Sequence, residues 1–172
     1  AALGMSYAGK RALVCMKHVG MNVCADAFVN SAITGVNGGL IVLAADDPSM
    51  HSSQNEQDSR MVARAAMVPV IEPSDSEEAR VFIKRAFELS EQYDTPIMFR
   101  TTTRLAHSQG LVHLEERQQI PDKPYEKNIA KNVMMPGNAI KRHLVVEDRL
   151  KRMAEDAATL DINKVEYNDT KI

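Results

Sequence analysis

Two polar segments hold the side chains that could bind a ligand or transfer a proton. In the first, residues 17–22, His18 is followed closely by Gly20. A glycine allows the backbone to approach a bound molecule, and a histidine can donate, accept or pass on a proton near neutral pH. A tight turn with a solvated histidine accounts for the same residues, so both interpretations stay open.

The second segment, residues 46–60 (loop 46–60), is the more unusual. Every side chain in it except those of Pro48 and Met50 can form a hydrogen bond. A segment dense in Asn, Gln, Ser and His suits hydrogen bonding to a polar substrate. We therefore expect loop 46–60 to face a ligand, with a solvated surface loop as the alternative.

Other kinds of site are weaker alternatives. His51 stands beside Ser52, but adjacency in sequence does not make a catalytic dyad, and the chain has no Gly-X-Ser-X-Gly elbow. A metal site from His51, Glu56 and Asp58 is also conceivable. Residues 100–104, which begin and end with arginine, are a candidate for an anion or interface contact.

Buried parallel strands are expected to position these segments. Residues 12–16 and 40–45 are short continuous apolar runs, typical of strands buried on both faces, and we expect both to be central strands. Residues 22–34 predict a helix with Asn22 as its N-cap that ends at the glycines of residues 35–39.

Strands and helices continue to alternate along the next part of the chain. We expect a helix over residues 57–66, a short edge strand over 69–71 and another strand over 95–100. Between the last two, Ser74 begins a capping-box pattern, and apolar residues at helical spacing follow it as far as Leu89. This order predicts an α/β fold with three layers, in which helices cover both faces of a parallel sheet.

The chain changes character near residue 115. We predict an α/β module over residues 1–115, truncated at its start, a linker over 116–137, and an amphipathic helix with a connector to a next domain over 138–172. The apolar positions that mark this helix are Ile140, Leu144, Leu150, Met153 and Ala157.

Composition limits the class of protein. The chain has 172 residues, of which 44% are hydrophobic and 26% charged, and a net charge of -2, so neither nucleic acid nor an anionic membrane is an expected partner. Its two cysteines, Cys15 and Cys24, form no metal or disulfide pattern, which favours a cytoplasmic setting. No apolar run approaches the roughly 20 residues that span a bilayer.

Both ends are expected to be cut from a longer polypeptide.

Taken together, four segments resemble the large subunit of indolepyruvate:ferredoxin oxidoreductases, a family of thiamine diphosphate-dependent 2-oxoacid oxidoreductases. The resemblance is close over residues 1–114 and loose over 141–172. The matching segments are residues 16–22, 46–58, 72–75 and 100–104.

The resemblance implies a pyrimidine-binding module, one of two related α/β modules that hold thiamine diphosphate and Mg between them. Enzymes of this family oxidatively decarboxylate aryl pyruvates such as indolepyruvate. They pass electrons through iron–sulfur clusters to ferredoxin and release an aryl-acetyl coenzyme A. The implied partners are the remaining domains of the same subunit, a smaller second subunit, the 2-oxoacid, coenzyme A and ferredoxin, and we expect a homo-oligomer.

The resemblance also implies roles for individual residues. His18 and His51 are the candidate catalytic residues. The residues expected to approach the cofactor are Lys17, His18, Val19 and Gly20. Those expected to line the 2-oxoacid pocket are Met50, His51, Gln54, Asn55, Gln57 and Asp58.

The chain departs from the family pattern in three ways. It has no Glu before Glu56 to protonate the aminopyrimidine, no Gly-Asp-Gly diphosphate motif and no cysteine runs for clusters. We therefore expect this chain alone to bind no cofactor or metal and to be inactive. A non-catalytic α/β binding or assembly module that keeps the scaffold is the alternative.

Overall fold

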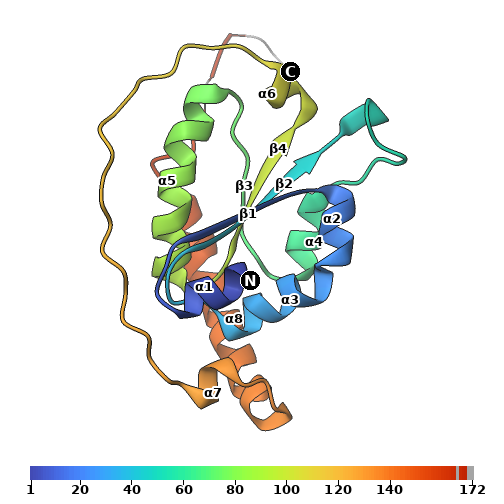
Figure 1. The fold of residues 1–172 in the computed structure, drawn as a ribbon. Helices are drawn as coiled ribbons and strands as arrows, with labels where there is room; N and C mark the ends of the chain where they lie inside the picture. The colour runs from blue at the N-terminus through green and yellow to red at the C-terminus, as the bar shows by residue number, and fades with distance from the viewer. Residues whose placement is uncertain (166, 170–172) are drawn as a thin grey trace.

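A four-stranded parallel sheet with the strand order β1-β2-β4-β3 forms the centre of the computed structural model (Figure 1). The structure describes residues 1–165 and 167–169. The strands are β1 (Ala12–Lys17), β2 (Leu40–Asp46), β3 (Val70–Ile71) and β4 (Ile97–Thr102). The larger helices are α2 (His18–Val23), α3 (Ala25–Thr34), α4 (Ser59–Ala65), α5 (Ser76–Tyr93) and α8 (Pro136–Ala157). The shorter elements are α1 (Ala2–Tyr7), η1 (Pro48–Met50), α6 (Thr103–His107) and α7 (Ile129–Asn132).

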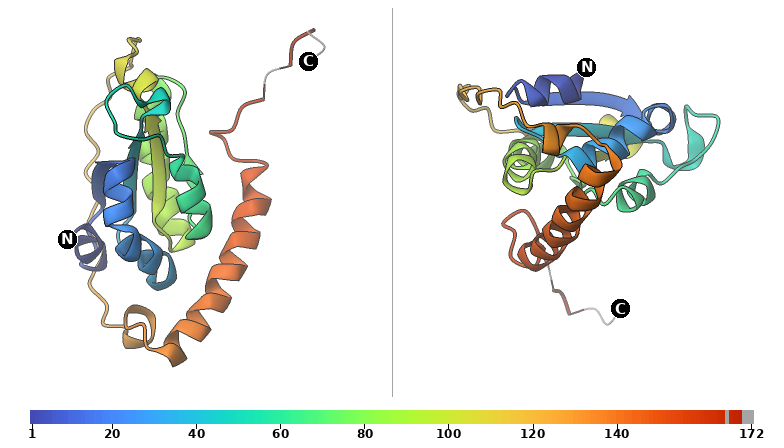
Figure 2. Two further views of the ribbon diagram at one scale, coloured as in Figure 1. Left: turned by 90° about the vertical axis from the view of Figure 1, so that its right-hand side faces the viewer. Right: turned by 90° about the horizontal axis from the view of Figure 1, so that it is seen from below.

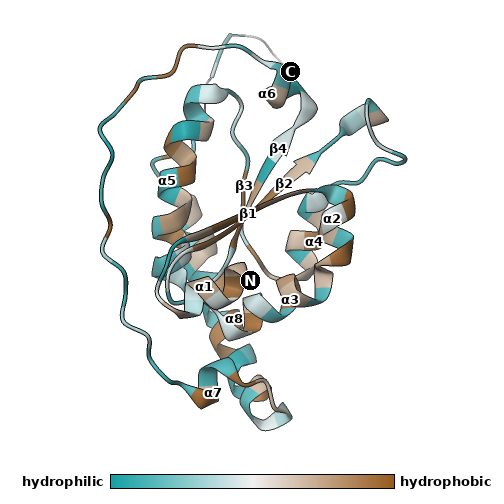
Figure 3. Cartoon of the chain, viewed as in Figure 1, coloured by the Kyte–Doolittle hydropathy of each residue, from teal (hydrophilic) through white to brown (hydrophobic). Residues whose placement is uncertain are grey.

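The two central strands, β2 and β4, are apolar on both faces, and Figure 3 shows the strands among the most hydrophobic parts of the chain. On one face, Val42 and Met98 pack with residues of α2, α3 and α4. On the other face, Ile41 and Phe99 pack with residues of α5. Successive side chains of a strand point to opposite faces, so these continuous apolar runs serve two cores. The three-layer α/β prediction is confirmed.

The order of the strands brings the polar loops together. The chain passes from β1 to β2 through α2 and α3, and from β2 to β3 through α4, all on one face. It then turns back through α5 on the other face to place β4 between β2 and β3. All pairings are parallel, so the carboxyl ends of the four strands lie at one edge of the sheet.

One of the two strands predicted to be central is at an edge. Within the described residues β1 pairs only with β2, and the side chains of Leu13 and Cys15 are exposed, Leu13 by 47%. A continuous apolar run indicates that both faces of a strand can be buried, but it does not indicate how many strands lie beside it. The prediction of an edge position around residues 69–71 is confirmed by β3.

The helix predicted over residues 22–34 is two helices. α2 begins directly after β1 at His18, and α3 begins at Ala25, so Asn22 lies inside α2 and is not an N-cap. The predicted glycine stop is confirmed, because Gly35 has a φ of 76°. A Cβ atom at Gly35 would also lie 2.2 Å from the Asp94 carboxylate, so this position requires glycine for space as well.

The N-cap of α5 lies one residue after the predicted one. The Asp75 carboxylate accepts a hydrogen bond from the Glu78 backbone N–H at 2.8 Å, while the Glu78 carboxylate accepts from the Ser74 N–H at 2.7 Å. Both Ser74 and Asp75 are followed three residues later by Glu, so the sequence contains two overlapping capping patterns. The stronger acceptor, a carboxylate, takes the N-cap position.

Residues 108–128 contain no helix or strand and run along the outside of the module from α6 to α7 (Figure 1). Ion pairs and hydrogen bonds hold this segment in place: Glu115 accepts from Arg80 at 2.9 Å, and the Lys123 N–H donates to the Gly9 carbonyl at 3.1 Å. Among residues 1–165 and 167–169, no helix is long and apolar enough to cross a membrane.

Helix α8 forms an outer layer that slants away from the sheet (Figure 2). Of the apolar residues that mark this helix, Ile140 and Leu144 are 70% and 69% exposed, while Met153 packs against the core on the α5 side of the sheet. The helix also carries the fully buried residues Val146 and Arg149. Apolar periodicity therefore indicates the helix but does not indicate Arg149 as a buried residue, because its contacts are polar.

Two arginines of α8 satisfy the carbonyl groups at the end of α3. Arg149 donates to the Ala32 carbonyl at 2.8 Å and to the Asp94 carbonyl at 2.6 Å, and Arg142 donates to the Ile33 carbonyl at 2.9 Å. The last carbonyls of a helix have no partner within the helix and carry its negative dipole, so they favour cationic donors. Burial lowers the pKa of Arg149 to about 10, which leaves it charged at neutral pH.

Replacing Arg149 should therefore destabilise the module. In Arg149→Ala two buried carbonyls lose their donor, and we expect the free energy of unfolding to fall by about 2–3 kcal/mol in urea titrations. The matched control is Arg152→Ala on the same helix, whose exposed pair with Asp148 should contribute less than about 0.5 kcal/mol. Equal losses in the two variants would contradict this role for Arg149.

Candidate functional site

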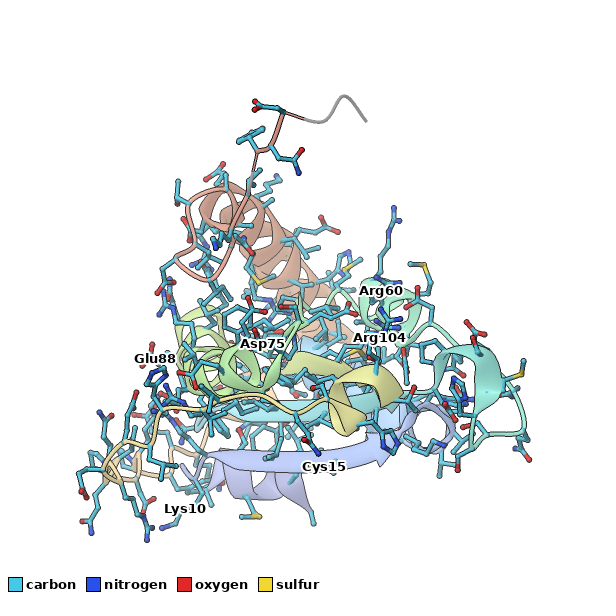
Figure 4. All side chains as sticks on the ribbon, turned by 90° about the horizontal axis from the view of Figure 1, so that it is seen from above. Lys10, Cys15, Arg60, Asp75, Glu88 and Arg104 are labelled. Atoms are coloured by element: carbon cyan, nitrogen blue, oxygen red, sulfur yellow. The ribbon has the colours of Figure 1, made fainter. Side chains whose placement is uncertain are left out.

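Polar loops converge where β1, β2 and β4 end. The strand register pairs Lys17 with Ala45 and Asp46 with Thr102, so the residues that follow these strands start side by side. Figure 4 looks down on this edge, with α6, which carries Arg104, beside the segment that contains η1. Ligands bind at this edge in parallel α/β sheets because strand ends and loops meet there.

Asp46 and Arg100 form a buried ion pair that joins the strand ends. The Arg100 Nε lies 2.6 Å from the Asp46 carboxylate, and a second nitrogen of the same guanidinium meets Glu72 after β3. Asp46 also accepts from the Ser59 N–H at 2.9 Å, which anchors the first turn of α4. Arg100 is therefore buried and paired with carboxylates of the chain. Of the two arginines in residues 100–104, only Arg104 is exposed and could bind an anion.

Asp47 organises the first part of loop 46–60. Its buried carboxylate accepts from the Ser53 hydroxyl at 2.7 Å, from the Ser52 N–H at 2.8 Å and from the His51 N–H at 3.2 Å. The Lys17 ammonium lies 3.3 Å away. The Ser53 hydroxyl, the Ser52 N–H and Lys17 together outweigh burial and lower the pKa of Asp47 to about 2.

The polar residues of loop 46–60 therefore divide into two groups. Asp46, Asp47 and Ser59 are buried and hold the loop in shape. A second group, which includes His51, Gln54 and Asn55, is exposed, as is the apolar Met50. Part of the polar composition that predicted a ligand is thus explained by hydrogen bonds within the chain.

The tip of the loop has an unusual backbone. Ser49 and Met50 have φ values of 66° and 56°, in the left-handed region that side chains other than those of Gly and Asn disfavour. The Glu56 carboxylate accepts from the Ser49 N–H at 3.0 Å and helps to hold this conformation. Such backbone strain is concentrated at functional sites, and here it presents Met50 and His51 outward.

His18 is fully buried, which rules out the alternative of a solvated histidine. Its Nε2 lies 2.9 Å from the Asn55 side-chain oxygen, so α2 and loop 46–60 are in direct contact. The His18 Nδ1 and the Gln57 Nε2 are both buried without a hydrogen-bond partner. Buried polar atoms are usually paired, so these two nitrogens have hydrogen-bonding capacity that no group of the chain uses.

The segment around Gly20 differs from the predicted turn. Residues 18–23 are the first helix after β1, and a Cβ atom at Gly20 would lie 2.8 Å from the Met16 Cβ. The glycine lets α2 pack closely on β1, which is a structural reason for glycine at this position, and its predicted approach to the cofactor stays a prediction. Lys17 donates to the Ser52 carbonyl at 2.8 Å and so ties loop 46–60 to the end of β1. Val19 is 37% exposed at the surface of α2.

The structure brings together most of the residues predicted for the site. Lys17 and His18 from the first segment both contact loop 46–60. Asp58 caps α4 through the Arg60 N–H at 3.0 Å and is also paired with the Arg60 side chain. The individual roles of these residues toward cofactor and substrate stay predictions.

Sequence analysis named Thr103 and Arg104 as part of a candidate anion contact but missed His107 and Ser108 and the place of His51 beside them. Thr103, Arg104, His107 and Ser108 line a hollow of about 550 Å³ together with His51. The polar residues directly after β4 were the only sequence feature that pointed to this hollow. That they lie near His51 follows only from the placement of β4 beside β2. A more enclosed and largely apolar cavity of about 460 Å³ lies between β3, α5, the end of α8 and the residues that follow it, and Glu72 is part of its lining.

The other kinds of site receive no support from the geometry. Among residues 1–165 and 167–169 no three His, Cys, Asp or Glu side chains are grouped to hold a metal ion. The Ser53 hydroxyl donates to Asp47 and also contacts Lys17, and the Ser52 N–H is bound to the same carboxylate. These contacts serve the loop and do not activate a nucleophile.

A parallel α/β module with polar loops from neighbouring strands at one edge is a ligand-binding unit of the kind on which many enzymes are built. Residues 1–170 match the family model described as "Pyruvate flavodoxin/ferredoxin oxidoreductase, thiamine diP-bdg", and the chain belongs to this family of thiamine diphosphate-binding domains. The resemblance inferred from the sequence segments is confirmed.

Several proteins named "Indolepyruvate oxidoreductase subunit IorA" are similar to this chain. The protein from Methanothermobacter marburgensis is 44% identical over 99% of the chain, and that from Pyrococcus horikoshii is 44% identical over 96%. The protein from Archaeoglobus fulgidus is 41% identical over 98%. The chain spans only 28%, 26% and 27% of the lengths of these relatives, respectively.

The Asp47 contacts make loop 46–60 sensitive to acid. The pKa of this carboxyl falls from about 3.9 in an unfolded chain to about 2 in the fold, so its stabilising contribution is present above about pH 4. It is lost as the pH falls from about 4 to about 2. We expect Asp47→Asn to lower the urea midpoint at pH 7 and the difference from the parent chain to shrink over that range.

Asp148→Asn, at an exposed pair with Arg152, is the matched control and should change the midpoint little at any pH. A destabilisation by Asp47→Asn that stayed constant from pH 7 to pH 2 would show that the carboxylate charge is not what stabilises the loop.

Proposed function

We propose that this chain supplies the pyrimidine-side half of a thiamine diphosphate site that oxidatively decarboxylates aryl pyruvates, such as indolepyruvate, to aryl-acetyl coenzyme A with ferredoxin as electron acceptor. The observation that carries the proposal is the family match over residues 1–170, joined to relatives 41–44% identical that are named for indolepyruvate oxidation. The convergence of the matching segments at one sheet edge supports it.

In this proposal the outward residues of loop 46–60 form one wall of the 2-oxoacid pocket. Met50, which has a strained backbone, and the adjacent His51 are both exposed, which suits side chains that contact a ligand. The unpaired nitrogens of His18 and Gln57 are the groups that could hydrogen-bond to cofactor or substrate. The residues assigned to the pocket are Met50, His51, Gln54, Asn55, Gln57 and Asp58, and those assigned to the cofactor side are Lys17, His18, Val19 and Gly20.

The residues present fit only part of a thiamine diphosphate site. The carboxylates at this edge are engaged: Asp46 and Glu72 with Arg100, Asp47 with Lys17. None is free to protonate an aminopyrimidine, and the described residues offer no acidic cluster for magnesium. The chain would therefore bind and orient, through His18 and His51, while the acid, magnesium, diphosphate and iron–sulfur ligands come from elsewhere.

The remaining parts of the assembly follow from the same proposal. Residues 116–137 would serve as a linker and 138–172 as the helix and connector to the next domain of the same subunit. A smaller second subunit would complete the site in the cytoplasm, where Cys15 and Cys24 stay reduced. The exposed apolar side chains of Leu13 and Val23 are surfaces that such contacts, or a second copy in a homo-oligomer, could cover.

A non-catalytic binding or assembly module is the second candidate function. The observation that favours it is that every carboxylate buried at the sheet edge is committed to a structural contact. Fold alone does not fix function, so activity must decide between the two. A complex that contains this chain and turns over an aryl pyruvate only with thiamine diphosphate would exclude the second candidate.

The isolated 172-residue chain should not bind the cofactor. Because it lacks a free carboxylate at this edge and a Gly-Asp-Gly diphosphate motif, titration calorimetry with thiamine diphosphate and Mg should show no micromolar binding. A micromolar dissociation constant would contradict the view that the chain holds only half of the site.

In the assembled oxidoreductase, His51→Ala and Gln54→Ala should lower kcat/KM for indolepyruvate. Both side chains are exposed, so the substitutions should leave stability unchanged, and losing a hydrogen bond to a charged substrate should cost about tenfold or more. The control Gln92→Ala replaces an exposed glutamine next to the end of α5, away from this edge. Unchanged kcat/KM in both loop variants would remove loop 46–60 from the substrate pocket.

A further inference from the structure

The hollow between loop 46–60 and α6 is a concave surface built by the ends of two neighbouring strands. Its volume is about 550 Å³, and its walls are His51 from the loop after β2 and four residues that follow β4. These four are Thr103, Arg104, His107 and Ser108. All five side chains can donate a hydrogen bond, and none is acidic.

Arg104 is the fixed positive charge of this hollow. Its guanidinium is exposed, and among the described residues no carboxylate forms an ion pair with it. The other cations at the same edge are already neutralised: Arg100 meets Asp46, and Lys17 meets Asp47. Arg104 is therefore an excess cation in a concave site.

The other acidic residues of this sheet edge do not change this balance. Asp58 is paired with Arg60, whose guanidinium Nε lies 2.9 Å away. Glu72 forms ion pairs with both Arg100 and Arg60. Glu56 accepts the Ser49 N–H at the far end of the loop and does not line the hollow. A concave surface lined by one sign of charge concentrates ions of the opposite sign.

We propose that this hollow is a binding site for an oxyanion, a carboxylate or a phosphate, with Arg104 as its principal ligand and with His51 and His107 also in its lining. A guanidinium presents a planar fork of donors that matches a carboxylate or phosphate in two-point contact. The hydroxyls of Thr103 and Ser108 supply further donors. The inference extends the proposed function, because His51 is shared between this hollow and the 2-oxoacid pocket.

Two substrates of the proposed reaction could supply the oxyanion. One is the carboxylate of the aryl pyruvate, and the other is a phosphate of coenzyme A. The chemistry of the site is the same in both cases, so the source must be found by experiment. In either case Arg104 determines affinity, and it would act as a specificity residue that sequence analysis of loop 46–60 alone does not reveal.

The direct test follows the imidazole resonances of His51 and His107 by NMR in the 172-residue chain. Inorganic phosphate, coenzyme A and indolepyruvate are titrated separately against the parent chain, Arg104→Gln and the control Arg64→Gln. Arg64 is an exposed arginine in the last turn of α4 and is not part of the hollow. We expect saturable shifts that Arg104→Gln weakens about tenfold or more and Arg64→Gln leaves unchanged.

Each outcome assigns the source or overturns the site. Shifts with phosphate and coenzyme A alone assign the coenzyme, shifts with indolepyruvate alone assign the 2-oxoacid, and shifts with all three establish a general oxyanion site. Absence of saturable shifts, or equal weakening by Arg104→Gln and Arg64→Gln, overturns the proposal.

Kinetics of the assembled oxidoreductase separate this inference from the proposed function. Arg104→Gln should raise the KM for the assigned substrate about tenfold while kcat changes less than about twofold, because the arginine binds and does not react. If the parent complex lacks thiamine diphosphate-dependent activity but the chain still binds oxyanions through Arg104, the proposed function fails and the site stands. An unchanged KM for both substrates overturns the site's role in the reaction.

Discussion

The ion pair between Asp46 and Arg100 is the contact on which the rest of this sheet edge depends. It joins the ends of the two central strands and, through Ser59 and Glu72, also fixes the start of α4 and the segment after β3. Both side chains are almost fully buried, so removing either one would leave an unpaired buried charge, which typically costs about 3–5 kcal/mol. The adjacent Asp47 stabilises loop 46–60 in a similar way. Its carboxylate accepts hydrogen bonds from three donors of the loop and forms an ion pair with the Lys17 ammonium.

This arrangement explains how a loop without regular structure can hold side chains in defined positions. Buried aspartates fix its beginning, the cap at Asp58 fixes its end, and the His18–Asn55 contact fixes its distance from α2. Between these anchors the side chains of Met50, His51 and Gln54 are exposed. The acids of this edge hold the scaffold, so in the proposed function the acid that serves the cofactor comes from outside this chain.

The sequence was sufficient to predict the features that depend on local patterns. Continuous apolar runs identified β1 and β2 as strands of a parallel sheet, and Gly35 marked the end of α3. The errors arose where the decision depends on distant residues. Only the strand order shows that β1 is at an edge. The burial of Arg149 could not be predicted locally, because its partners, Ala32 and Asp94, are 117 and 55 residues away in the sequence.

The same holds for the site. Composition identified loop 46–60, but Arg100, which neutralises Asp46, is 54 residues away in the sequence. For that reason composition could not separate the structural aspartates from the outward residues, nor place Arg104 opposite His51.

In the proposed function, loop 46–60 and α2 together form one wall of a thiamine diphosphate site whose other wall lies outside this chain. A structure of the assembled oxidoreductase with the cofactor bound tests it most directly. We expect the thiazolium ring to lie against the His18–Asn55 contact, with His51 facing the position of the 2-oxoacid and a carboxylate from outside these 172 residues at the aminopyrimidine. A cofactor bound with loop 46–60 facing solvent and out of contact with the ring would contradict the account.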